Sequence, residues 1–151
     1  MFARALLAFV ALPGVVAFLV PVAWLWYSGQ IQIIHLWGLI PLSIGCLTLL
    51  WCVRDFYVSG KGTLSPWASP RRLVVVGLYR FSRNPMYISV LMILLGWTAG
   101  FSSIPLFIYT LAVMIAFHLR VVYGEEPALA RKFDGDWENY TNQVARWFWR
   151  V

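Results

Sequence analysis

Charged residues are scarce in this sequence, and they are unevenly distributed. Of 151 residues, 12% are charged and 61% are apolar, whereas soluble domains have about 25% charged and about 45–50% apolar residues. Arg4 is the only charged residue in 1–53, and residues 86–119 carry no charge. The apolar content excludes a disordered chain, and the segregation of charge argues against a water-soluble globule and indicates a polytopic membrane protein.

Motifs typical of soluble enzymes are also missing. The sequence has no G-x-G-x-x-G, G-x-x-x-x-G-K-[ST], G-x-S-x-G or H-E-x-x-H pattern, so we expect neither a Rossmann fold nor a P-loop. Cys46 and Cys52 share one apolar stretch and are predicted to be buried free thiols. No metal site is expected, because His35 and His118 fall at separate levels of the predicted membrane.

The apolar runs predict an all-α protein with four transmembrane helices. Residues 86–119 would extend about 51 Å at 1.5 Å per residue, too long for one crossing, so the break at 100–105 predicts a helical hairpin. Gly38 and Gly45 in the second run are expected to allow close helix packing. The predicted spans are about 5–27, 33–53, 86–100 and 104–121.

The basic residues predict the orientation. All twelve lie at the N-terminus, in the 54–84 loop or after residue 119, which places both termini and this loop in the cytoplasm. The six acidic residues lie on the same side, so charge-based chemistry is expected there. We expect the net charge of +6 to attract anionic membrane lipids rather than nucleic acid.

The C-terminal part predicts a cytoplasmic amphipathic helix. From Glu125 onward, apolar residues recur every three or four positions; they are Leu129, Phe133, Trp137, Tyr140 and Val144. The Asp134-Gly135-Asp136 segment is expected to interrupt this helix. The aromatic residues 147–149 are expected to form an interfacial foot, a segment that rests in the membrane interface. Residues 73–76 fit either a short strand or an interfacial segment. We predict a single domain over 1–151, with two spans in 1–53 and the loop, hairpin and C-terminal part in 54–151.

Two polar clusters lie at predicted cytoplasmic helix ends. The first reads Gly77-Leu-Tyr-Arg-Phe-Ser-Arg-Asn-Pro-Met-Tyr87. Pro85 suits a first helical turn, Asn84 suits the cap, and free N–H groups with Arg80 and Arg83 would attract an anion. An ordinary helix start beside a membrane explains the same residues, and spacing alone favours that interpretation.

The second cluster is Glu125-Glu126-Pro127, directly after the last predicted span. These carboxylates could belong to a site, but an ordinary solvated helix start also explains them, so the cluster alone is a weak signal. His118 precedes Glu125 by seven positions, so the two share a face if the helix continues. An ionisable ring within a span is a candidate functional residue, although a hydrogen-bonded structural histidine is as plausible.

Taken in order, these clusters resemble the integral-membrane methyltransferase superfamily of isoprenylcysteine carboxyl methyltransferases and phospholipid methyltransferases. That pattern is approximately G-x-Y-R-x-x-R-[HN]-P-x-Y followed by E-E-x-x-L-x-x-x-F-G-x-x-Y-x-x-Y, and it covers about residues 60–150. The sequence departs from it at Asn84, where histidine is usual, at Asp134 and at Trp137. The matching residues are 77–80, 83–87, 125–126, Leu129, Phe133, Tyr140 and 144–147.

The resemblance implies a cytoplasmic site for S-adenosylmethionine. Arg83 and the Asn84-Pro85 corner would hold the amino-acid carboxylate, and Glu125 or Glu126 would bind the ribose or the ammonium group. An aromatic wall for adenine would come from Tyr79, Tyr87 or Trp137. The implied cofactor-binding residues are Tyr79, Arg83, Asn84, Pro85, Tyr87, Glu125 and Glu126.

The resemblance also implies methyl transfer to a lipophilic acceptor that arrives through the bilayer of a bacterial or archaeal cell membrane. An acceptor carboxylate of the isoprenylcysteine type needs no base, whereas the amine of a lipid head group must lose a proton. In the second case His118 or Glu125 is the predicted catalytic base. The alternative is a non-catalytic lipid-binding or scaffold protein that keeps the same frame, as the three departures would allow.

Overall fold

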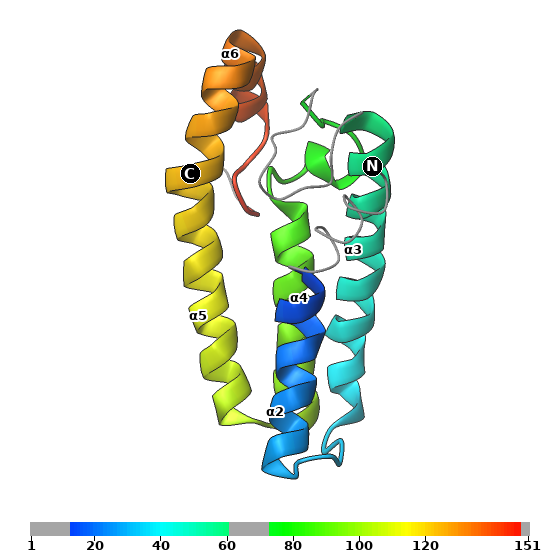
Figure 1. Cartoon of the computed structure of the whole chain (residues 1–151). Coiled ribbons are helices and arrows are strands. Elements are labelled where there is room, and N and C mark those ends of the chain that lie inside the picture. Colours follow the sequence, from blue (N-terminus) through cyan, green and yellow to red (C-terminus); the bar gives the residue numbers. More distant parts are fainter. Residues whose placement is uncertain (1–12, 61–72, 149–151) are drawn as a thin grey trace.

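The computed structural model describes residues 13–60 and 73–148, and it shows an all-α protein (Figure 1). The first half contains the π-helical turn η1 (Val15–Leu19), α2 (Val20–Ser28), the 3-10 turn η2 (Leu36–Gly38) and α3 (Leu39–Gly60). The second half contains the 3-10 turn η3 (Gly77–Arg80), α4 (Pro85–Phe101), α5 (Ile104–Arg120), the π-helical turn η4 (Val121–Glu125) and α6 (Glu126–Gln143).

The apolar helices lie where the sequence predicts its spans. Two helical segments of the described chain, Leu36–Asp55 and Ile104–Gln143, are long and apolar enough to cross a membrane. Val15–Ser28 and Pro85–Phe101 are shorter apolar helices. The first predicted span, 5–27, lies partly outside the described residues. That all four helices cross a membrane stays a prediction.

Two helices extend beyond the predicted spans. Helix α3 continues to Gly60 rather than ending near residue 53, so Arg54 and Asp55 are helical. Helix α5 does not end at 121 but passes through η4 directly into α6. A proline ring clashes with the carbonyl four residues earlier, and the wider π-helical turn before Pro127 gives it room.

A π-helical turn also precedes a proline in the first helix, where η1 comes directly before α2 and its Pro21. The carbonyl groups of η1 accept hydrogen bonds from neighbouring helices: the indole Nε1 of Trp97 donates to the carbonyl of Ala17 at 2.9 Å, and the hydroxyl of Tyr109 donates to that of Val16 at 3.1 Å. Side chains of α4 and α5 therefore satisfy the backbone of η1, as a medium without water requires.

Helices α3 and α4 pack closely along their length (Figure 1). A Cβ atom placed on Gly38 would lie 2.4 Å from the backbone of Gly100, and one on Gly45 would lie 2.8 Å from the carbonyl oxygen of Ser89. A Cβ atom placed on Gly96 would lie 2.5 Å from the Cβ atom of Leu42 and 2.7 Å from its backbone nitrogen. The predicted close packing at Gly38 and Gly45 is confirmed.

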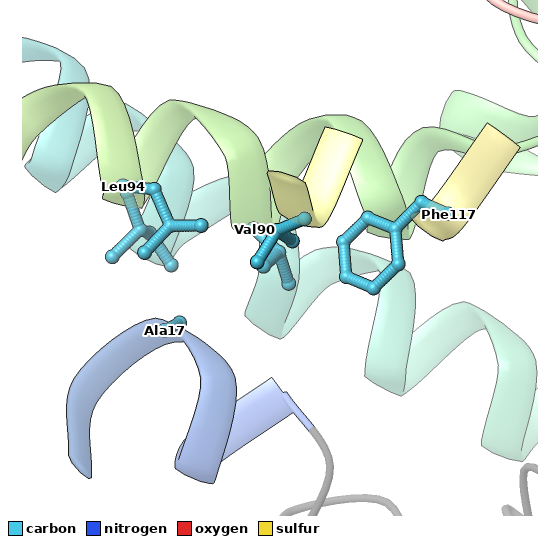
Figure 2. Packing of buried hydrophobic residues seen from close by; sticks show 6 residues of the cluster. Ala17, Val90, Leu94 and Phe117 are labelled. Atoms are coloured by element: carbon cyan, nitrogen blue, oxygen red, sulfur yellow. The ribbon is translucent and has the colours of Figure 1, made fainter. Parts of the chain in front are cut away.

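The largest buried cluster lies where η1, α4 and α5 meet (Figure 2). Its buried residues are Ala17, Val90, Ile93, Leu94, Val113 and Phe117. Large apolar side chains such as Leu47, Leu50 and Ile108 remain exposed on the outer helix faces. Such a surface suits contact with lipid better than contact with water.

We predict that Gly96→Ala destabilises the protein because the new methyl group enters the backbone of Leu42. Overpacking of this kind costs about 1–3 kcal/mol, so the melting temperature in detergent should fall by several degrees. Gly135→Ala is the matched control, since a Cβ atom there meets nothing within 4 Å, and its helical propensity should make it neutral or slightly stabilising. Equal melting temperatures for the two variants would contradict this packing.

The C-terminal part agrees with the sequence at its kink and differs at its end. Asp134 adopts non-helical angles (φ 41°, ψ −115°), which confirms the predicted interruption. Val144 is extended and lies outside the helix, contrary to its predicted helical spacing. Trp147 packs against the buried cluster rather than forming an interfacial foot, whereas Phe148 is exposed; Trp149 lies outside the described residues.

Residues 73–75 form neither a strand nor a helix. Val74 is buried with Cys52 and Tyr79, which ties this segment to the C-terminal half of α3. Both cysteines are free, as expected, with Cys52 buried and Cys46 half-buried.

Candidate functional site

The first polar cluster is joined to the C-terminal segment by backbone hydrogen bonds. Ser82 and Ala145 form an isolated parallel bridge, and the amide of Arg83 donates to the carbonyl of Ala145 at 2.9 Å. Pro85 occupies the first turn of α4, as predicted. Asn84 is the N-cap residue, but its side chain donates to the carbonyl of Arg146 at 3.0 Å instead of capping the helix.

Glu126 lies between two arginines from distant parts of the chain. Arg83 Nη1 is 3.1 Å from Glu126 Oε1. Arg146 donates from Nε to Oε1 at 2.9 Å and from Nη2 to Oε2 at 2.8 Å. This two-pronged geometry is the strong form of an arginine–carboxylate contact. We call these three residues the Glu126 cluster.

The Glu126 cluster is largely shielded from water. The side chains of Arg83 and Glu126 are 13% and 15% exposed. Burial lowers the pKa of the Arg83 guanidinium, and the nearby Glu126 carboxylate opposes that shift. The hydrogen bonds to Glu126 raise the pKa of Arg146. Two guanidinium groups thus share one carboxylate, and the cluster carries a net positive charge that suits an anionic ligand group.

Arg83 keeps one donor atom that no described residue pairs. Its Nε atom is buried and has no hydrogen-bond partner within the described part of the chain. Its guanidinium lies 5.7 Å from the ring centroid of Trp137 on α6. Arg83 therefore combines a free donor with an adjacent aromatic face. Arg80, the other predicted basic residue of the turn, is exposed.

Glu125 has a different set of partners. The hydroxyl of Tyr87 donates to Glu125 Oε1 at 2.5 Å, and Nε of Arg120 donates to the same oxygen at 2.9 Å. The ring of Tyr87 also packs 4.5 Å from that of Phe117. We call Tyr87, Arg120 and Glu125 the Glu125 cluster. The sequence did not indicate Arg120, because residues five apart do not face each other on an α-helix and only the π-helical turn η4 brings this pair together.

Tyr79 ties the η3 turn to α6. The hydroxyl of Tyr140 donates to the carbonyl of Tyr79 at 2.7 Å. The Tyr79 side chain is buried beside Cys52 and Val74, and burial raises its pKa well above the ordinary value. The phenol is therefore neutral, and the arrangement indicates a role in holding the turn.

His118 lies apart from both glutamate clusters in its contacts. Its ring is exposed and stacks 6.2 Å from that of Trp147, whose Nε1 donates to His118 Nδ1 at 3.4 Å. The helix does continue from His118 to Glu125, but Glu125 turns to Tyr87 and Arg120. A catalytic role of His118 stays a prediction.

A pocket of about 550 Å³ opens between α6 and the segment 73–75. Its volume is typical of small-molecule sites, roughly 300–1,000 Å³. Its polar residues carry no signal in the sequence, because they resemble an ordinary solvated helix face. The lining residues are Leu73, Val75, Phe133, Asp136, Asn139, Tyr140 and Gln143.

Comparison with known proteins gives one match. The family model described as "Phospholipid methyltransferase" matches residues 33–136, more than half of the chain. This range includes α3, α4, α5, both glutamates and Arg83. Neither the curated proteins nor the solved structures include a match to the chain.

Proposed function

Because the chain belongs to the phospholipid methyltransferase family, we propose that it transfers a methyl group from S-adenosylmethionine to a membrane lipid. One observation carries this proposal beyond family membership: the two polar clusters of the sequence meet in space. Arg83 and Tyr87, at the start of α4, contact Glu126 and Glu125 respectively. Two neighbouring carboxylates are thus held by different partners at one end of the helices.

The Glu126 cluster fits the amino-acid end of this cofactor. Arg83 offers a buried Nε donor without a protein partner among the described residues, which matches the need of a ligand carboxylate. Glu126 would accept hydrogen bonds from an ammonium or a ribose hydroxyl, and Trp137 offers an aromatic face beside Arg83. When bound, S-adenosylmethionine supplies an electrophilic methyl group on a sulfonium.

The Glu125 cluster suits deprotonation of the methyl acceptor. Glu125 is one-third exposed, whereas Glu126 is 15% exposed, so Glu125 is the more accessible of the two. Tyr87 and Arg120 both donate to Oε1, which leaves Oε2 to receive a proton from a lipid ammonium group. For such an acceptor Glu125 acts as the base. Much of the rate would come from holding donor and acceptor in line.

The four apolar helices support a bilayer route for the acceptor. We propose that they cross the membrane at about 5–27, 33–53, 86–100 and 104–121, with both termini and the two glutamate clusters on the cytoplasmic side. The exposed apolar side chains of these helices face lipid. A lipid head group would then reach Glu125 from the membrane surface.

We expect the purified protein to bind S-adenosylhomocysteine, the product form, with a micromolar dissociation constant in a calorimetric titration. This measurement needs no knowledge of the acceptor. Binding would justify a search of lipid extracts with a labelled methyl donor, where we expect label in an amine-bearing phospholipid. Absence of binding in two detergents and in nanodiscs would contradict the proposal and favour the scaffold alternative.

A further inference from the structure

The η3 turn packs directly against a side chain of α3. Gly77, its first residue, has a left-handed backbone conformation (φ +56°). A Cβ atom placed on Gly77 would lie 1.9 Å from Asp55 Oδ2 and 3.1 Å from Nε1 of Trp51. Glycine is thus required here by backbone conformation and by contact with Asp55.

The contact of Asp55 with this turn is steric. Its side chain is 13% exposed, and Oδ2 is buried with no hydrogen-bond partner in 13–60 or 73–148. The other oxygen, Oδ1, lies 3.9 Å from the exposed Arg54, too far for a hydrogen bond. Because no hydrogen bond from the described residues holds Oδ2, packing sets its position against Gly77.

Gly77 is linked to Arg83 through the backbone of the η3 turn, which hydrogen bonds from Leu78 onward hold in place. Within the turn, the amides of Phe81 and Ser82 donate to the carbonyl of Leu78 at 3.1 and 3.2 Å. Ser82 and Arg83 then pair with Ala145. A shift of Gly77 away from α3 would therefore be transmitted to Arg83, whose guanidinium contacts Glu126.

We propose that Asp55 is a positioning residue for Arg83, acting through the volume of its carboxyl group beneath Gly77. This inference rests on the proposed function, since it assigns Arg83 to cofactor binding. Asp55 lies on α3, outside both polar clusters, and we assign it no contact with the cofactor. An amide of the same shape should therefore support the turn as well as the carboxylate does. A smaller side chain should leave the turn without this support.

The test compares S-adenosylhomocysteine affinities of single and double variants by calorimetry. Asp55→Ala should weaken binding about three- to tenfold, and Asp55→Asn should bind within about twofold of wild type. Gly77→Ala should weaken binding more than about tenfold. Adding Asp55→Ala to Gly77→Ala should recover at least about threefold, because the clash is removed. Gly29→Ala is the control for backbone strain, since Gly29 has φ +70° but open space around it.

Each outcome bears on the inference. If wild type binds and Asp55→Ala binds equally well, or if the double variant binds no better than Gly77→Ala, Asp55 does not position Arg83 and only this inference fails. If wild type does not bind, the proposed function fails and this inference with it. Recovery of folding in the double variant, where Gly77→Ala alone does not fold, supports the contact. If neither variant folds, the inference is judged by the affinities of Asp55→Ala and Asp55→Asn alone: weaker binding only in Asp55→Ala supports it, and equal binding contradicts it.

Discussion

Glu126→Gln should reduce affinity for S-adenosylhomocysteine by at least about 100-fold, because it removes the charge that holds two guanidinium groups in place. Arg83 and Arg146 both contact this carboxylate. Without it they would repel each other, and Arg83 would leave the position that the ligand carboxylate needs. Arg83→Ala removes the donor itself and should have a similar effect.

The measurement is the calorimetric titration, made on protein that remains monodisperse in detergent. Glu138→Gln is the matched control, because it makes the same change on an exposed residue of α6. We expect the control to bind like wild type. Unchanged affinity in both Glu126→Gln and Arg83→Ala would show that the Glu126 cluster is a structural ion pair and not a ligand site.

Glu125→Gln should separate catalysis from binding. For an amine acceptor, loss of the base should lower kcat by about 100- to 10,000-fold. Affinity for S-adenosylhomocysteine should change by less than about threefold, because Glu126 and Arg83 are untouched. Tyr87→Phe should have a smaller effect on kcat, since it removes one of the two donors to Glu125 Oε1.

Methyl transfer to aminophospholipid in nanodiscs, measured with a labelled donor, provides kcat. Glu138→Gln again serves as the control, and His118→Ala tests the other predicted base. A loss of cofactor affinity equal to the loss of kcat in Glu125→Gln would place Glu125 in the cofactor site. Full activity in Glu125→Gln with a large loss in His118→Ala would move the base to His118.

Local patterns predicted most of the helices. An uncharged run of sufficient length forms a helix in an apolar medium because every backbone group must be bonded within the chain. Pro85 begins α4, and the Asp134-Gly135-Asp136 segment interrupts α6, as expected from their local conformational preferences. Gly38 and Gly45 lie against α4, because small residues allow backbones to approach.

Features that depend on distant segments were missed. Trp147 turns inward because the Ser82–Ala145 bridge directs the last residues back along α5. The pocket beside α6 exists only because the segment 73–75 lies against that helix. The packing of Gly77 on Asp55 likewise joins residues far apart in the sequence, and neither residue alone predicts it.

By itself, the sequence determined that this protein is helical and apolar, where most of its helices lie, and that polar clusters flank the helical hairpin. Only the tertiary structure decided which partners each glutamate contacts. Successive residues on a helix point about 100° apart, so neighbouring carboxylates face different elements. The π-helical turn η4 directs Glu125 toward Tyr87 and Arg120, while Glu126 faces Arg83 and Arg146. Local preference sets the helix, but the partners come from elsewhere in the chain.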